Sequence, residues 1–248
     1  MVRVFALFDW HYQAGFGATP KLEWLHGILM DQLAMCGDSD HLVVALGGDI
    51  GNSGSAQEYE EVKEALDAIL SSCMGLQGRF HVLAVPGNHD CDLATAPGLR
   101  SIALDTIARD PHPQETLLLE AASVQGAFFE FAVTLGILSN SNPRLAWRKE
   151  ILVGQQSLVI DCCNTACTSR LQEQYGQLRF PPSAIPKVPL HAQMALLLAH
   201  HPLEWLAQSD REELQDLLAS GYDLLLTGHD HHADVVSVLK EAGRYSHI

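Results

Sequence analysis

The sequence predicts a mixed α/β protein whose central strands are buried on both faces. Short apolar runs alternate along the chain with longer segments whose apolar residues recur at helical spacing. The short runs are almost continuously apolar, which is typical of strands that other elements cover on both sides. Polar residues, many of them histidines, directly follow several of these runs. In sheets of this kind, site residues gather at the carboxyl ends of the strands.

Residues 1–90 predict three strands and two helices. The first helix has Pro20 at its start and Gly37 after its last turn, which are ordinary start and stop signals. The third strand runs into a Pro-Gly turn. The expected order is strand 2–8, helix 20–35, strand 41–49, helix 55–73 and strand 80–90.

Residues 91–146 predict a helical insertion, with helices near 97–109 and 114–136, inside one domain that spans 1–248. More strands and a helix are expected after it. They are a strand pair over 150–164 that turns near Gly154, a segment 191–202 that is either helix then strand or strand throughout, helix 211–221, and a strand that begins at 222.

The composition argues against several classes of protein. With 47% hydrophobic and 18% charged residues, the chain has enough apolar surface to form a core. The net charge of −15 disfavours a broad surface for nucleic acid or anionic membrane, although a small positive pocket stays open. No segment is expected to span a bilayer, and the N-terminal apolar run stops at Asp9, too early for a signal peptide.

The six cysteines contain no CxxC pair. Adjacent Cys162 and Cys163 follow an apolar strand, so we expect buried, reduced thiols rather than disulfides or a zinc knuckle. Reduced thiols favour a cytoplasmic location.

Five strand ends carry side chains that could bind a metal. Taken singly, each is compatible with a solvated loop, an ordinary turn or a hydrogen-bonded core histidine. Together they supply two carboxylates, one amide and up to four imidazoles, which we expect to meet at the strand ends of a single sheet. They are Asp9 with His11, Asp49, Asn88 with His89, His200 with His201, and His229 with His231. The i, i+2 spacing at 9 and 11, and at 229 and 231, predicts that each pair points the same way from extended backbone.

Oxygen and imidazole donors without thiolates suit zinc, manganese or iron. The set is too large for one tetrahedral ion and fits two, which in hydrolases lie roughly 3.5–4 Å apart and share a carboxylate and a hydroxide. Two divalent ions bring four positive charges, of which Asp9, Asp49 and the hydroxide return three. The pocket therefore stays net positive and should favour an anionic group such as phosphate.

Five short motifs occur in the order found in the calcineurin-like metallophosphoesterase superfamily, which the chain therefore resembles. The resemblance implies a two-sheet β-sandwich flanked by helices in four layers. The motifs are Asp9-Trp10-His11, Gly48-Asp49, Gly87-Asn88-His89-Asp90, His200, and Gly228-His229-Asp230-His231.

The resemblance also implies two divalent metal ions (manganese, iron or zinc) and a role for each motif residue. His89 would not bind metal but would donate a proton to the leaving oxygen or stabilise the charge that develops there. The first ion would be held by Asp9, His11 and His231, the second by Asn88, His200 and His229, and Asp49 would bridge the two.

Some neighbours of these residues depart from the family pattern or play outer roles. Asn52 and Ser53 replace the Asp and Arg of the protein phosphatase branch, which argues against that branch. Without an Asp at 52, we expect Asp90 or a backbone carbonyl to support His89. His201 is expected to lie just outside the ligands. Asp230 and His232 should point away from the metals, and Asp234 has no predicted role.

The resemblance and the charge of the pocket predict a hydrolase that cleaves phosphoester bonds, with a phosphodiester of a cyclic nucleotide or nucleotide-like molecule as substrate. The alternatives are a nuclease, for which Arg144, Arg148 and Lys149 could form a basic patch, and a catalytically weak scaffold of the same fold. A metallo-β-lactamase reading fails, because Ala233 and Asp234 stand where Asp and His would be needed. No membrane partner is expected, and the oligomeric state is open.

The chain stops 17 residues after His231. Domains of the superfamily usually continue with further strand at this point. We therefore expect the sequence to be the N-terminal part of a longer protein.

Overall fold

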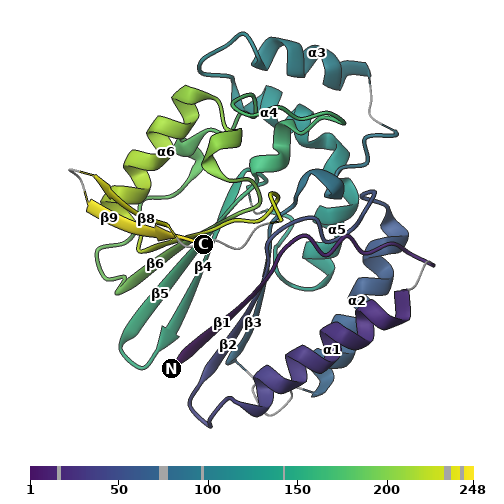
Figure 1. Cartoon of the computed structure of the whole chain (residues 1–248), viewed down its shortest axis with the longest axis vertical. Coiled ribbons are helices and arrows are strands. Elements are labelled where there is room, and N and C mark those ends of the chain that lie inside the picture. Colours follow the sequence, from purple (N-terminus) through teal and green to yellow (C-terminus); the bar gives the residue numbers. More distant parts are fainter. Residues whose placement is uncertain (16–17, 73–77, 96–97, 142, 232–235, 241–242) are drawn as a thin grey trace.

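The computed structural model describes residues 1–248 except 16–17, 73–77, 96–97, 142, 232–235 and 241–242. Two β-sheets lie against each other, with helices on their outer faces (Figure 1). This arrangement confirms the expected mixed α/β fold with two flanked sheets.

The first sheet contains three parallel strands in the order β1-β2-β3. The strands are β1 (Val2–Leu7), β2 (His41–Leu46) and β3 (Phe80–Ala84). The central strand is buried from Leu42 to Leu46, because neighbours lie on both edges and on both faces. Helices α1 (Ala18–Ala34) and α2 (Ala56–Ser72) run along the outer face of this sheet, as Figure 1 shows.

The second sheet has six strands in the order β4-β5-β6-β7-β9-β8. The outer pairs β4–β5 and β8–β9 are antiparallel, and the central strands are parallel. The sequence pattern of 191–202 fits either a helix followed by a strand or a strand throughout. In the structure this segment contains one strand, β6, which is preceded by turns and by no helix. The strands are β4 (Ala146–Val153), β5 (Gln156–Cys163), β6 (Met194–Ala199), β7 (Leu224–Leu226), β8 (Val236–Lys240) and β9 (Gly243–His247).

Alternate residues of β6 belong to two different cores. Leu196 and Leu198 pack in the cluster between the two sheets, whereas Leu197 and Ala199 pack toward α6 (Gln208–Gly221) on the outer face. The strand period of two therefore buries both faces of the second sheet. Helix, sheet, sheet and helix form the four layers.

The insertion contains α3 (Gly98–Ile107), α4 (Glu115–Ala121) and α5 (Gly126–Thr134). The helix expected over 114–136 is divided by a 3₁₀ turn, Ala122–Gln125. Within that turn the Gln125 side chain is fully buried, and its amide exchanges two hydrogen bonds with the amide of Asn164. This long-range pair explains why a continuous helical pattern is interrupted, and local sequence could not show it.

By length and composition alone, one stretch of this region could span a membrane, although no spanning segment is expected from the sequence. The stretch Glu115–Thr134 has the length and apolarity of a membrane span, with a mean hydropathy of 1.3 over 18 residues. Half of that window is buried inside the protein, and Phe128 and Phe131 belong to the main hydrophobic core, where their rings contact Tyr59 of α2. A core helix satisfies the same criteria of length and composition.

The five described cysteines carry free thiols, and four of them are buried. Burial raises the pKa of the Cys163 thiol, with the charge of Asp161 acting in the same direction. The four buried thiols are therefore poor nucleophiles that act as packing groups, as expected, whereas Cys36 is only partly buried. Cys73 lies outside the described residues.

Candidate metal centre

The predicted site residues come from both sheets, not from one. Since the parallel strands of the two sheets end on the same side of the molecule, the loops that follow them meet there. The expectation of a single sheet is thus wrong, because the sandwich brings two sets of strand ends together. Asp9 and His11 follow β1, Asp49 follows β2, Asn88 and His89 follow β3, His200 follows β6, and His229 and His231 follow β7.

Four donor atoms form a tight group around one point. Asn88 Oδ1 lies 3.2 Å from His200 Nε2 and 3.1 Å from His229 Nδ1, and these two ring nitrogens lie 3.2 Å apart. Asp49 Oδ1 lies 3.4 Å from His200 Nε2. Ligands about 2.0–2.1 Å from a tetrahedral zinc lie roughly 3.3 Å from each other. The spacing therefore fits the coordination shell of one ion.

A second group lies on the other side of Asp49. Donor atoms of Asp9, His11 and His231 are within 4.8 Å of one another. The other oxygen of the shared carboxylate, Asp49 Oδ2, lies 3.7 Å from His11 Nε2. Each oxygen of Asp49 thus faces a different group, which is the placement that a bridging ligand needs.

The backbone reaches these positions through left-handed turns. The expectation that residues 9 and 11, and 229 and 231, project from extended backbone is wrong, because both strands end before them. Side chains disfavour positive φ, so residues held there mark sites where the surroundings impose the conformation. The five are Asp9 (φ 54°), His11 (46°), Asp49 (51°), His229 (72°) and His231 (53°).

Glycines next to the ligands permit the close approach of the loops. A Cβ on Gly87 would lie 2.1 Å from Asp49 Oδ1, and one on Gly48 would lie 2.5 Å from His200 Nδ1. Gly48 also has φ +95°, which favours glycine independently. Both motif glycines are therefore required by the geometry of the centre.

His89 lies between the two groups, and one of its ring nitrogens is within 4.8 Å of donor atoms of His11 and Asp49. Its backbone N–H donates to Asp49 Oδ1 at 2.8 Å, and its ring lies edge-on to that of His11 at 4.6 Å. Ring atom Nδ1 donates to the Asn52 carbonyl at 2.9 Å, so Nε2 is left to exchange a proton. Of the two supports expected for His89, the backbone carbonyl is the one present.

Asp90 organises the loops instead. It is fully buried, and both of its oxygens accept hydrogen bonds from backbone N–H groups. Burial, followed by the charge of Asp49, raises the pKa of Asp90 to about 6. Its donors lie on the loops after β2 and β3 and on α2: the N–H groups of Ile50, Gly51 and Gly87, and the hydroxyl of Tyr59.

Charges within the centre are strongly coupled. Burial alone would raise the pKa of Asp49, but the hydrogen bond and charge of His200 hold it well below its usual range. Burial lowers the pKa of His200, yet Asp49 outweighs burial and raises it to about 9. Burial, reinforced by His201 and His200, lowers the pKa of His229 to about 4. His200 Nδ1 donates to the Gly47 carbonyl at 3.0 Å, which directs Nε2 into the group.

His201 lies next to this group, and one of its ring nitrogens is within 4.8 Å of donor atoms of His200 and His229. Its ring centroid is 4.5 Å from that of His229, and it is fully buried. Asp230 points away from the donors and accepts a hydrogen bond from Trp205 Nε1 at 3.1 Å. The expectations for His232 and Asp234 fall outside the described residues.

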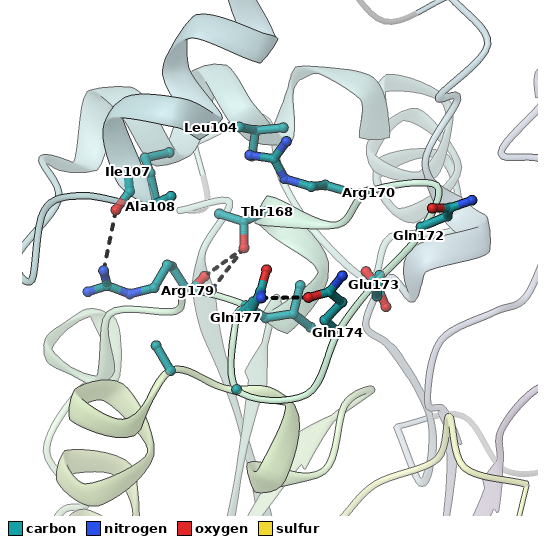
Figure 2. A pocket seen from close by; sticks show the side chains of 13 residues that line it. Leu104, Ile107, Ala108, Thr168, Arg170, Gln172, Glu173, Gln174, Gln177 and Arg179 are labelled. Carbon is teal, nitrogen blue, oxygen red and sulfur yellow. Dashed lines mark hydrogen bonds between the residues drawn. The ribbon is translucent and has the colours of Figure 1, made fainter.

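Sequence reasoning missed Glu173, which contacts both His201 and His229. It belongs to a polar loop that follows no apolar run and carries no motif, so no local signal marks it. The same loop borders a cavity of about 380 Å³ between itself and α3, which Figure 2 shows. Arg179 lines the same cavity and forms an ion pair with Asp210, in which Nε lies 2.7 Å from the carboxylate.

Part of the basic patch considered for nucleic acid has contacts within the protein, while Arg144 and Lys149 are exposed. Arg148 pairs with Asp161 at 2.7 Å and also donates to the carbonyls of Pro186 and Lys187. Arg144 lies over the ring of Phe129 at 4.9 Å. Both guanidinium groups therefore have structural partners.

The strands of two packed sheets end on the same side, and oxygen and imidazole donors gather there. This arrangement is typical of metal-dependent hydrolases. The chain belongs to the calcineurin-like phosphoesterase family, whose sequence model matches residues 3–233. Members hydrolyse phosphoester bonds with bound metal ions, usually two, and the clusters described above are able to bind metal.

Among solved structures, the chain is similar to a phosphopantetheinyl hydrolase from Mycobacterium tuberculosis. The two share 13% sequence identity with a TM-score of 0.41, and the match covers 99% of this chain and 88% of the other. No curated protein sequence matches the chain.

Proposed function

We propose that this phosphoesterase hydrolyses a phosphodiester in a small, nucleotide-like molecule. The observation that carries the proposal is the position of Asp49, with one oxygen toward each group of donors. Among the described residues, Lys21 is the cation whose contact with the centre is shown, and it donates to the backbone carbonyls of Trp10 and His11 rather than to a ligand side chain. A singly charged diester suits such a centre better than a doubly charged monoester, which would favour extra cations.

The chain's own residues would divide the work as follows. Two divalent ions would polarise the phosphoryl group and activate water. The Asn52 carbonyl accepts the Nδ1 proton of His89. As an imidazolium, His89 would deliver its second proton from Nε2 to the leaving oxygen and return to the neutral ring with Nδ1–H. The first ion would be held by Asp9, His11 and His231, the second by Asn88, His200 and His229, and both would share Asp49.

A substrate panel tests this function. Protein supplied with Mn²⁺ or Zn²⁺ should cleave bis(p-nitrophenyl) phosphate and cyclic nucleotides with a larger kcat/KM than p-nitrophenyl phosphate. A clear preference for the monoester would contradict the diester proposal.

Two variants test the roles of the residues. Asp49→Asn should lose bound metal and activity together, because it removes the charge shared by both groups. His89→Ala should keep its metal, measured by elemental analysis, while kcat falls about 10²–10⁴-fold. Loss of metal from the His89 variant would show that its role has been assigned wrongly.

A small-molecule substrate also predicts weak, salt-insensitive contact with nucleic acid. Arg148 is paired internally, so the patch can offer a phosphate backbone at most Arg144 and Lys149. The affinity for single-stranded DNA should change little between 50 and 200 mM salt, whereas a nuclease making several phosphate contacts would show a steep decline.

A further inference from the structure

Glu173 is a nearly buried carboxylate in a loop far in sequence from every motif. Its side chain is only 6% exposed, although it lies in the polar segment between β5 and β6. A carboxylate out of water is unfavourable unless positive charge or hydrogen bonds compensate for the lost hydration. Its oxygen Oε1 is buried and makes no hydrogen bond of normal geometry among the described residues, although the Ser169 hydroxyl lies beside the carboxylate. The closest positive or donating groups that the structure shows are those near Oε2.

Oε2 is directed at two histidines of the centre. It lies 3.1 Å from His201 Nε2 and 3.8 Å from His229 Nε2. The other ring nitrogen of His201 lies 3.0 Å from Thr165 Oγ1, and that hydroxyl also accepts the backbone N–H of His201. Thr165 therefore donates its proton to Nδ1, and His201 donates from Nε2 to the carboxylate.

The two nitrogens of His229 face opposite partners. Nδ1 faces Asn88 Oδ1 and His200 Nε2, whereas Nε2 faces Glu173. A carboxylate beside the outer nitrogen favours the tautomer whose proton is on Nε2, which leaves the Nδ1 lone pair for an ion. The indole of Trp205 lies edge-on to the ring of His229 at 4.3 Å and restricts its rotation.

We infer that Glu173 is a positioning residue, which orients His229 and raises the affinity of the centre for its second ion. The inference rests on the proposed metal ligands, since it acts through His229. Histidine ligands of metals commonly donate their outer N–H to a carboxylate, and loss of that partner weakens metal binding about 10–100-fold. Glu173 places a carboxylate oxygen 3.8 Å from His229 Nε2, and the same side chain lines the cavity beside α3 (Figure 2).

Glu173→Gln tests the inference, because it keeps the shape of the side chain and removes its charge. Titration calorimetry of metal-free protein with Mn²⁺ and with Zn²⁺ should show a dissociation constant for the second ion about 10–100 times larger than in the wild type. The first ion should bind as before. Glu204→Gln is the matched control. It makes the same change at an exposed glutamate in the 3₁₀ turn Leu203–Trp205, which follows β6.

A double variant separates positioning from a general structural role. In the His229→Ala background, Glu173→Gln should have no further effect on metal binding, because its target is gone. Wild-type metal affinity in the single variant, or additive losses in the double variant, would overturn the inference. Failure of the proposed function would appear differently, as wild-type protein that binds both ions without cleaving a phosphodiester.

Discussion

At the scale of single residues, the centre depends on backbone conformations that side chains disfavour. Left-handed backbone costs about 1–2 kcal/mol for a residue with a side chain, and Asp9 and His11 both adopt it. Hydrogen bonds from their N–H groups to the carbonyls of Gly48 and Asp49 hold them in place. The loops after β1 and β2 therefore stabilise each other through these backbone hydrogen bonds. A substitution that shifts one loop should displace the ligands on the other.

Gly87→Ala should disrupt the centre without unfolding the protein. The new Cβ would meet Asp49 Oδ1 at 2.1 Å and the backbone nitrogen of Asp49 at 2.5 Å, so the shared carboxylate must move. Metal content by elemental analysis and kcat/KM should both fall at least about tenfold, since metal binding here depends on ligand placement. Gly126→Ala is the control, because it meets nothing within 4 Å at a helical position and should retain full metal content.

At the scale of elements, Asp90 connects the loops after β2 and β3 to α2. Each of its oxygens accepts at least one backbone N–H, so the carboxylate satisfies donors from two strand ends together. A single buried side chain therefore sets the distance between the loop that carries Asp49 and the turn that carries Asn88.

Asp90→Asn should destabilise the protein by about 2–3 kcal/mol, because an amide must direct an N–H against a buried N–H. Denaturant unfolding of metal-free protein would measure the change. Tyr59→Phe removes only one of the hydrogen bonds to Asp90 and should cost about 1 kcal/mol. Equal effects of the two substitutions would show that the backbone bonds to Asp90 contribute little.

At the scale of the whole molecule, the two ends of the first sheet behave differently. The carboxyl ends of its strands carry the metal centre, and the amino ends bring His41 and His81 together, with His41 Nδ1 3.1 Å from His81 Nε2. Burial, then the charges of Lys149 and His41, lowers the pKa of His81 to about 4. Burial and the charge of Arg79 also lower the pKa of His41.

This pair should make the protein less stable in mild acid. The unfolded chain takes up protons near pH 6.5 that the folded protein does not bind until near pH 4, so the free energy of unfolding falls over that window. Between pH 7 and pH 5 the wild type should lose free energy of unfolding. His81→Gln should make that loss smaller by about 1 kcal/mol, a figure reduced for solvent screening because His81 is only half-buried. Denaturant unfolding at both pH values measures it. The exposed His112, changed to Gln, should leave the slope as in the wild type.

Much of the fold could be predicted because its signals are local. The strands of the first sheet, the hairpin at Gly154 and the helices before and after β2 follow from apolar spacing and from glycine and proline positions. The interrupted helix near Gln125 could not be predicted, since its cause is a hydrogen-bonded pair with Asn164, 39 residues away. The pattern of 191–202 fits either a helix followed by a strand or a strand throughout. The pairing of β6 with β5 and with β7 decides between them, and those partners are far away in the sequence.

The sequence by itself determined which donors the protein has and in which order they occur, because each motif is a short strand end with its own turn. Only the tertiary structure decided which of those donors lie together in each of the two groups around Asp49. Two sheets meet at the centre, left-handed backbone replaces extended backbone at Asp9 and His229, and the carbonyl of Asn52 supports His89. Glu173 joins them from a loop with no motif. Such contacts depend on distances between segments far apart in the chain, and local patterns carry no information about those distances.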